Sequence, residues 1–372
     1  MARSKHFART LVGAGLVSLI AMTAAQDGSA AWPLAESGTS VDAKDPANWP
    51  NDPEYGYKAS AVKSERRSGS WNFYGFQPDR SEGAQPLRPA EVGKPVGMSV
   101  DLAWRLTTGN SKVLISILDS GPRWHARDII NKAYINVGEL AKHKPKAKDG
   151  KPCAGKGDFP EFDCNGDGVV SFKDWTDDPS LLPEASAGHP KGDKNNNGML
   201  DPGDLILNFS DGVDDDGNGY ADDICGWDFL MDDNDPFEDT DFYHGTNQAG
   251  FAAAETNNGE GEAGMCPECR FVPLRVGDSF IADSNDFGQA VVYSADNGIA
   301  AIECALGTIN LSPYAQRAVE YAWQKGAIVT GSMADENSKH HNLPNTSEER
   351  NINPKTTRLP LTTPGDAPSM MT

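Results

Sequence analysis

The sequence predicts an α/β fold built on a parallel sheet, and two observations carry that prediction. Residues 113–118 form a continuous apolar run, as expected of a strand buried on both faces. Beyond residue 244, segments with helical spacing alternate with apolar segments typical of strands. Such alternation implies helices on both faces of the sheet, with functional groups gathered at the carboxyl ends of the strands.

The individual elements follow from their patterns and end signals. We expect strands at residues 113–118, 269–276, 298–306 and 327–333. We expect helices at residues 244–256, 286–297 and 313–325. The first of these helices is rich in small residues, and Gly326 ends the last one.

Charge is concentrated in one region of the chain. The 372 residues include 33 basic and 54 acidic ones, for a net charge of −21. Residues 158–241 contain 24 acids and 3 bases and therefore carry the whole excess. An acidic chain is a poor partner for a phosphate backbone, which argues against nucleic acid as a ligand. Charge packed this densely predicts bound cations.

Residues 1–25 have the features of a secretory signal peptide. Arg3, Lys5 and Arg9 precede an uncharged apolar run at residues 11–25, which ends in small residues. The run is shorter than the roughly 20 residues that a membrane-spanning helix needs, so we favour cleavage near Ala25 over an uncleaved anchor. No other segment could cross a membrane. The mature protein is expected to be secreted, in the periplasm or the extracellular medium.

The cysteines fit an exported protein. The six cysteines could form disulfides, although the sequence leaves their connectivity open. Cys266-Pro267-Glu268-Cys269 has the spacing of a redox motif but lacks a thioredoxin-like context, which favours a structural disulfide between its two ends.

The chain divides into regions of different composition. Residues 26–95 are rich in Pro, Gly, Ser and charge and contain an aromatic cluster at Trp71, Phe73, Tyr74 and Phe76. We interpret them as an N-terminal extension or pro-segment. Residues 96–342 carry the ordered patterns, with the acidic stretch 158–241 as an insertion, and residues 343–372 are expected to form an irregular tail.

Two segments of the insertion match the calcium loop of the EF-hand. Both place oxygen ligands at loop positions 1, 3, 5, 9 and 12, Gly at position 6, and a backbone carbonyl ligand at position 7. The predicted ligands are Asp163, Asn165, Asp167, Val169, Ser171 and Asp174 in the first loop, and Asp193, Asn195, Asn197, Met199, Asp201 and Asp204 in the second. Position 12 is Asp instead of Glu, which shortens the reach of that ligand. Calcium is favoured over magnesium, which prefers fewer protein ligands.

A third segment, residues 214–223, begins in the same way but has Cys225 at position 12, so it must close differently. Its candidate ligands are Asp214, Asp216, Asn218, Tyr220 and Asp222. The alternative for all three segments is a solvated, acidic, turn-rich loop.

Several motifs occur in an order that resembles a known family. Leu118-Asp119-Ser120-Gly121 ends the first strand, and His244-Gly245-Thr246-Asn247-Gln248-Ala249-Gly250 begins a helix. These resemble the Asp and His motifs of the subtilisin-like serine peptidases, or subtilases. Pro273-Leu274-Arg275-Val276, Ala305-Leu306-Gly307 and residues 328–333 resemble the strands and substrate-binding edge that follow, and residues 214–229 resemble an insertion of many secreted subtilases. The resemblance spans residues 96–342.

The resemblance implies a subtilisin-like three-layer fold and an Asp, His and Ser triad. Asp119 would orient and stabilise the imidazole of His244, which would act as general base and then general acid. Ala305, Leu306 and Gly307 would bind an extended peptide or protein substrate by strand addition.

The sequence departs from the family pattern at three places. Asn247 replaces a His that is not the catalytic base. Asp335 stands where the oxyanion-hole Asn is expected, and an ionised carboxylate accepts hydrogen bonds without donating any. The nucleophile motif Gly-Thr-Ser-Met-Ala occurs nowhere in the chain, and Ser369, which follows Pro368, has no helix after it. Proteolysis by this chain alone is therefore not expected.

Two explanations remain open for the absent motif. The chain could be a truncated or frame-shifted form of a serine endopeptidase, with a fold that is incomplete at its C-terminus. It could instead be a divergent, non-catalytic member that serves as a secreted calcium-binding, peptide-binding module.

Overall fold

The computed structural model describes residues 32, 48–55, 70–75, 97–279, 281–307 and 312–332. The predicted signal peptide, the predicted tail at residues 343–372, and Asp335 lie outside these residues.

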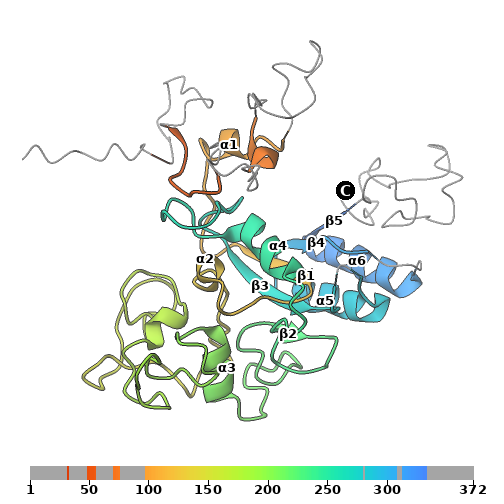
Figure 1. Ribbon diagram of the computed structural model, residues 1–372. Coiled ribbons are helices and arrows are strands. Elements are labelled where there is room, and N and C mark those ends of the chain that lie inside the picture. The colour runs from red at the N-terminus through yellow and green to blue at the C-terminus, as the bar shows by residue number, and fades with distance from the viewer. Residues whose placement is uncertain are drawn as a thin grey trace, which may run out of the picture.

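A five-stranded parallel sheet forms the centre of the fold, which confirms the predicted α/β class (Figure 1). The strand order is β2-β3-β1-β4-β5, so the first predicted strand lies in the middle. The strands are β1 (Leu114–Asp119), β2 (Trp227–Asp228), β3 (Arg270–Arg275), β4 (Ala301–Cys304) and β5 (Ile328–Gly331). The two-residue β2 was not predicted, because a pair of residues carries no readable period.

The three predicted helices are present. They are α4 (His244–Ala253), α5 (Ser284–Asp296) and α6 (Pro313–Lys325). Gly326 ends α6, as the sequence indicates, and the side chain of Ser312 caps its start. Three shorter helices were not predicted, namely α1 (Val100–Ala103), α2 (Arg127–Ile130) and α3 (Pro202–Phe209).

The sheet lies between two helical layers. Alternate residues of β1 point to opposite faces. Ile117 packs in one core cluster with Ala249 of α4, whereas Leu118 packs in a second cluster with Ala290 of α5 and Ala318 of α6. Each fully buried Leu or Ile stabilises the fold by about 1.5–3 kcal/mol relative to an exposed one. The predicted three-layer arrangement is therefore present.

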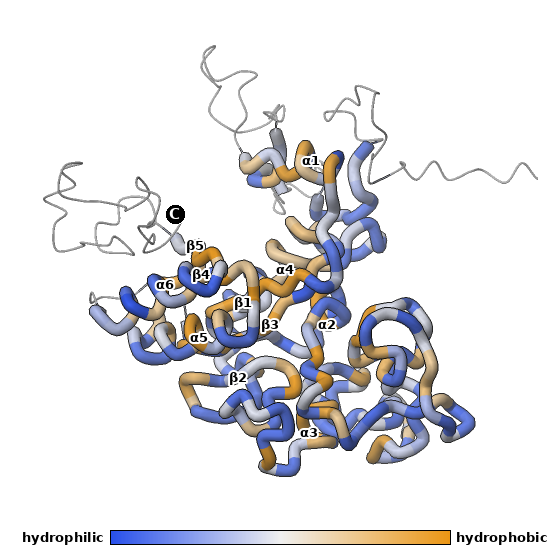
Figure 2. Tube along the Cα trace, turned by 180° about the vertical axis from the view of Figure 1, so that it is seen from behind, coloured by the Kyte–Doolittle hydropathy of each residue, from blue (hydrophilic) through white to orange (hydrophobic). Residues whose placement is uncertain are grey.

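The acidic insertion forms a packed lobe beside the sheet, coloured yellow to green in Figure 1. Trp175, Leu181 and Leu205 are fully buried there and belong to the core cluster on the α4 face. A disulfide joins Cys153 to Cys164 at the start of the insertion. Apolar positions are interspersed along a largely hydrophilic trace (Figure 2). The insertion therefore contributes buried side chains to the core of the domain.

The N-terminal segments pack at the other end of the molecule from this lobe (Figures 1 and 2). Tyr55, Phe73 and Tyr74 form a buried cluster with Trp104, which follows α1, and with Ala263. Part of the predicted aromatic cluster thus binds to the domain, while Phe76 lies outside the described residues. Among the described helices, none has the length and apolar character needed to cross a membrane.

Candidate functional site

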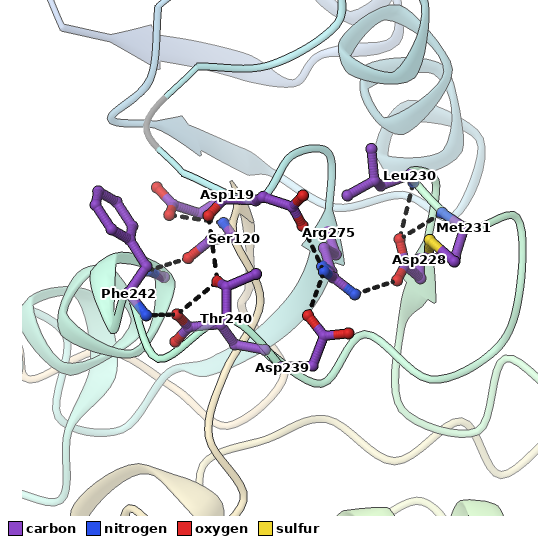
Figure 3. Close-up of polar contacts among 12 residues, drawn as sticks. Asp119, Ser120, Asp228, Leu230, Met231, Asp239, Thr240, Phe242 and Arg275 are labelled. Atoms are coloured by element: carbon purple, nitrogen blue, oxygen red, sulfur yellow. Dashed lines mark hydrogen bonds and ion pairs between the residues drawn. The ribbon is translucent and has the colours of Figure 1, made fainter.

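The carboxyl ends of the strands bring several polar side chains to one edge of the sheet (Figure 3). Asp119 ends β1 and Arg275 ends β3, and the two residues are paired in the strand register. Asp228 ends β2 and pairs with Arg275 on its other side. This edge is the place where parallel sheets carry their functional groups.

Asp119 and His244 meet at this edge. The Nδ1 atom of His244 lies 2.8 Å from both carboxylate oxygens of Asp119. Asp119 is fully buried, and it also accepts a hydrogen bond of 2.7 Å from the N–H of Ser120. The His244 side chain is 26% exposed, so its ring lies between the buried carboxylate and the surface. The two residues that the sequence nominated as a pair are in direct contact.

Close backbone packing makes this contact possible. Ser120 Oγ accepts a hydrogen bond of 3.0 Å from the N–H of Gly245, which joins the end of β1 to the start of α4. A Cβ atom at Gly245 would overlap the backbone of Gly121. Gly121 has φ 88° and lies against the carbonyl of Pro236, so a side chain there would also collide. The two glycines let the motifs approach.

A buried carboxylate organises the loop in front of His244. Glu238 is fully buried and accepts hydrogen bonds from the backbone N–H groups of Phe242 and Tyr243. Arg123 donates to the carbonyl of Glu238 at 2.9 Å and stacks on the ring of Tyr243. Sequence reasoning missed both residues, because neither belongs to a motif and their partners are known only from the fold.

Arg275 anchors the opposite side of the edge. It is 4% exposed and contacts the carboxylates of Asp228 at 2.9 Å, Asp239 at 2.8 Å and Asp278 at 2.7 Å. Burial disfavours its charge, but these carboxylates outweigh burial, so the pKa of Arg275 is raised. The resulting cluster ties together the ends of β2 and β3 and the loop that leads to His244 (Figure 3).

The predicted substrate-binding residues 305–307 follow β4 directly, at the same edge as Asp119. The carbonyl of Gly307 accepts the N–H of Ala282 at 3.1 Å, so one side of this segment is already paired. Just before it, Glu303 lies close to Asp119 and is partly buried. Burial, together with the negative charge of Asp119, raises the pKa of Glu303 to about 8. Glu303 was not predicted as a site residue.

The three predicted calcium loops share one internal geometry. The side chain at position 5 accepts the N–H of position 7, in the pairs Asp167–Val169 (2.7 Å), Asn197–Met199 (3.0 Å) and Asn218–Tyr220 (2.8 Å). The carboxylate at position 1 accepts the N–H of the glycine at position 6, in the pairs Asp163–Gly168, Asp193–Gly198 and Asp214–Gly219. These glycines have φ of 90–97°. Glycine at position 6 therefore permits the turn, as the motif requires.

The first two loops lead into helices at the predicted positions. Ser171 and Asp201, at position 9, are the N-caps of the 3₁₀ turn Phe172–Trp175 and of α3. Asp174 and Asp204, at position 12, reach back to the N–H groups at positions 2 and 3. In the second loop the amide of Asn195 lies 3.2 Å from a carboxylate oxygen of Asp201. Positions 3, 9 and 12 thus lie close together around the start of each loop.

The third loop brings one of its predicted ligands close to two carboxylates outside the predicted set. Asp216 lies with Glu139 and Asp223, and their carboxylate oxygens are within 4.8 Å of one another, close enough to hold a metal ion. Asp222 instead accepts the N–H groups of Asp211 and Gly212. Glu139 is far away in the sequence, so no loop motif could have indicated it.

Burial shifts the carboxylates of these loops toward the neutral form. It raises the pKa of Asp174 and of Asp204 to about 6 and that of Asp223 to about 7. Oxygen donors held away from water in this way fit a hard divalent cation, whose charge would offset the cost of burying them.

The cysteine assignment is settled in part. Cys266 and Cys269 form a disulfide, as expected from their spacing, and Cys225 and Cys304 are buried free thiols.

Comparison with known proteins agrees with this arrangement. A sequence model of the subtilase family matches residues 110–372, which include both Asp119 and His244. The chain is 39% identical over 116 residues to a thermophilic serine proteinase of Bacillus sp. (strain AK1), covering 31% of this chain and 28% of that protein. It is 36% identical over 122 residues to thermitase of Thermoactinomyces vulgaris, covering 32% and 43%.

Among solved structures, a protease of Pseudoalteromonas arctica PAMC 21717 aligns with a TM-score of 0.32 and 20% identity, over 63% of this chain and 53% of the other. The chain spans less than half the length of the two relatives above. The family model matches more than half of the residues, and the structure places the Asp motif at the end of β1 and the His motif at the start of α4. The chain therefore belongs to the subtilase family.

Proposed function

We propose that this chain is a serine endopeptidase-type domain with a preorganised Asp119–His244 pair, which does not hydrolyse peptides by itself because it lacks the nucleophile. The contact between Nδ1 of His244 and the Asp119 carboxylate is the observation that carries this proposal.

In the proposed mechanism Asp119 accepts the Nδ1 proton of His244, which fixes the ring as the tautomer with a basic Nε2. The burial of Asp119 keeps water from competing for that proton. Nε2 would take a proton from a hydroxyl nucleophile and return it to the leaving amine. Asp335 replaces the amide donor of the oxyanion hole, so this chain also lacks a neutral donor at that position.

A fluorophosphonate probe tests the catalytic part of the proposal, since it labels only an activated serine. We expect no labelling of the folded chain and no cleavage of unfolded casein. The matched control is His244→Ala, which should give the same background. Labelling that is lost in His244→Ala would show that a serine elsewhere in the chain serves as nucleophile and would contradict the proposal.

We also propose that the loops at residues 163–174, 193–204 and 214–223 bind calcium. Their shared turn geometry and buried carboxylates support this assignment. In the third loop the ligands would be Glu139, Asp216 and Asp223. Bound calcium would offset the charge of the insertion.

The alternative is a secreted, non-catalytic calcium-binding module that holds an extended peptide at residues 305–307. The position of this segment at the carboxyl end of β4 favours it, although an incoming peptide must compete with the Ala282–Gly307 hydrogen bond. Calorimetric titration with an unstructured peptide library distinguishes the two. Saturable, calcium-dependent binding without cleavage supports the module, and the absence of any binding excludes it.

A further inference from the structure

A small basic pocket lies at the end of the sheet opposite the candidate active site. Arg270 is the first residue of β3, and Lys112 lies just before β1. Five strand steps of about 3.3 Å separate Arg270 from Arg275, so the pocket is roughly 16 Å from the catalytic edge. Its volume is about 70 Å³. Because one water needs about 10–15 Å³ on this measure, the pocket has room for a small polyatomic ion.

Arg270 is held rigidly at the pocket wall. Its Nε donates to the carbonyl of Ser111 at 2.9 Å, and its Nη1 donates to the carbonyl of Val170 at 2.9 Å. The guanidinium stacks on the ring of Tyr134, with 5.0 Å between its carbon and the ring centroid. Two of the five N–H groups of an arginine are thereby used, and the others keep their donor capacity.

The charge of Arg270 is not balanced by the surrounding described residues. Among the described residues no carboxylate forms an ion pair with Arg270, whose contacts are two backbone carbonyls and the ring of Tyr134. Burial lowers the pKa of Arg270, and Tyr134 opposes this effect in part. Arg270 is partly buried, and a cation that is partly removed from water normally has an acidic partner, because desolvation of an unpaired charge is costly. An arginine of this kind, rigidly placed at a pocket, points to an anion as the missing partner.

The other residues that line the pocket also carry a net positive charge. Lys112 and Lys156 approach the pocket from two other segments, and Asp158 is its only acidic residue. Asp158 pairs with Lys112 at 2.6 Å, and both side chains are largely exposed. Two cationic charges therefore remain in excess, within a chain of net charge −21. Such local excess is not a consequence of composition.

We propose that this pocket binds a small oxyanion, such as sulfate, phosphate or a free carboxylate, with Arg270 as the principal donor and Lys156 as a second cation. A guanidinium fork suits the paired oxygens of these ions, and charge-assisted hydrogen bonds are the strongest that proteins form. The bound ion would accept hydrogen bonds from the N–H groups of Arg270 that do not donate to the carbonyls of Ser111 and Val170.

The pocket also adjoins the first calcium loop. Gly168, Val169 and Val170 line it, and Arg270 holds the carbonyl of Val170 next to the predicted carbonyl ligand of Val169. An ion that fixes Arg270 would therefore stabilise this end of the loop and strengthen calcium binding, and calcium would strengthen ion binding by the same factor. This coupling rests on the proposed calcium function, whereas oxyanion binding does not.

Calorimetric titration of the full chain with sodium sulfate, against sodium chloride at matched ionic strength, tests the proposal. We expect saturable binding by the wild type, weakened about tenfold or more in Arg270→Gln and several-fold in Lys156→Gln. Lys148→Gln removes an exposed charge outside the pocket and should bind like the wild type. Lys156 is exposed, so that variant stays informative if Arg270→Gln does not fold.

Two further titrations show which class of anion binds and whether its binding depends on calcium. Acetate in place of sulfate shows whether a carboxylate suffices, and repetition in chelator shows whether calcium is needed. Saturable binding that persists in chelator supports the oxyanion site even if the calcium proposal fails. Equal titrations for the wild type, Lys156→Gln and Lys148→Gln, or sulfate effects no larger than those of chloride, would overturn the proposal.

Discussion

The imidazole Nδ1 of His244 lies 2.8 Å from both carboxylate oxygens of Asp119, although 125 residues separate the two in the sequence. The whole acidic insertion is placed between them without disturbing this contact. The Ser120–Gly245 hydrogen bond joins the end of β1 to the start of α4, which carries His244. The contact therefore depends on the packing of these two element ends.

Replacement of Asp119 by Asn should release the ring of His244 from its fixed tautomer. The amide can present a donor where the carboxylate accepts, so the Nδ1–H proton loses its acceptor. We expect the far-downfield proton resonance of this hydrogen bond to be present in the wild type and absent in Asp119→Asn, by NMR. The exposed Asp177→Asn serves as control. A resonance that survives in Asp119→Asn would mean that the two residues do not interact in solution.

Removal of calcium should lower the thermal stability of the chain. A site held at 100 times its dissociation constant contributes about 2.7 kcal/mol, so a chelator should lower the midpoint of unfolding by several degrees. Asp163→Ala and Asp193→Ala should each abolish part of this effect, because each loses a position-1 ligand. Asp177→Ala, in the same insertion, should leave it unchanged. A midpoint that is the same with and without chelator excludes calcium as a stabilising ligand.

Attachment of the N-terminal segment should weaken as the pH rises through neutrality. Glu54 donates its N–H to Gly261, and Asp52 accepts two N–H groups from the same loop. Burial, with the nearby charges of Glu54 and Asp128, raises the pKa of Glu262 to about 7. Burial raises the pKa of Asp128 to about 6.

Both pKa values lie above the ordinary values, so the attached state takes up protons. The contribution of the protonated Asp128 and Glu262 to the stability of this attachment is complete below about pH 4 and is lost as the pH rises through 6 and 7. We expect the hydrogen-exchange protection factors of residues 48–55 to fall by about tenfold between pH 5 and pH 8. Glu262→Gln should flatten this dependence, and the exposed Glu260→Gln should not. A pH-independent protection factor in the wild type would contradict the linkage.

Loss of Arg275 should destabilise the chain strongly. Asp228 is 1% exposed and would remain as a buried, unpaired carboxylate. Removal of one partner of a buried ion pair costs about 3–5 kcal/mol, so Arg275→Met should lower the urea midpoint accordingly. The double variant Arg275→Met/Asp228→Asn should recover part of the loss, because no charge is then buried. Equal stability of the wild type and Arg275→Met would show that the cluster contributes nothing.

Long, regular patterns made most of the fold predictable. The apolar run that became β1 and the capped segment that became α6 matched closely, because burial on a sheet and helix capping are encoded by neighbouring residues. The turn-forming glycines of the predicted calcium loops were also predictable, because their role follows from the spacing of residues within one loop. Short elements such as β2 and α2 were missed, because a segment of two to four residues is too short to show a periodic pattern or a recognisable cap.

The sequence alone determined where four of the five described strands lie along the chain, the Asp and His motifs themselves and the turn geometry of the acidic loops, because each of these depends on residues that are neighbours in the chain. The tertiary structure decided which distant groups complete these sites. Only folding places Glu139 beside Asp216, Glu238 beneath the backbone that leads to His244, and Arg270 in its pocket. Burial and charge balance are properties of groups that meet in space, and sequence separation carries no record of such meetings.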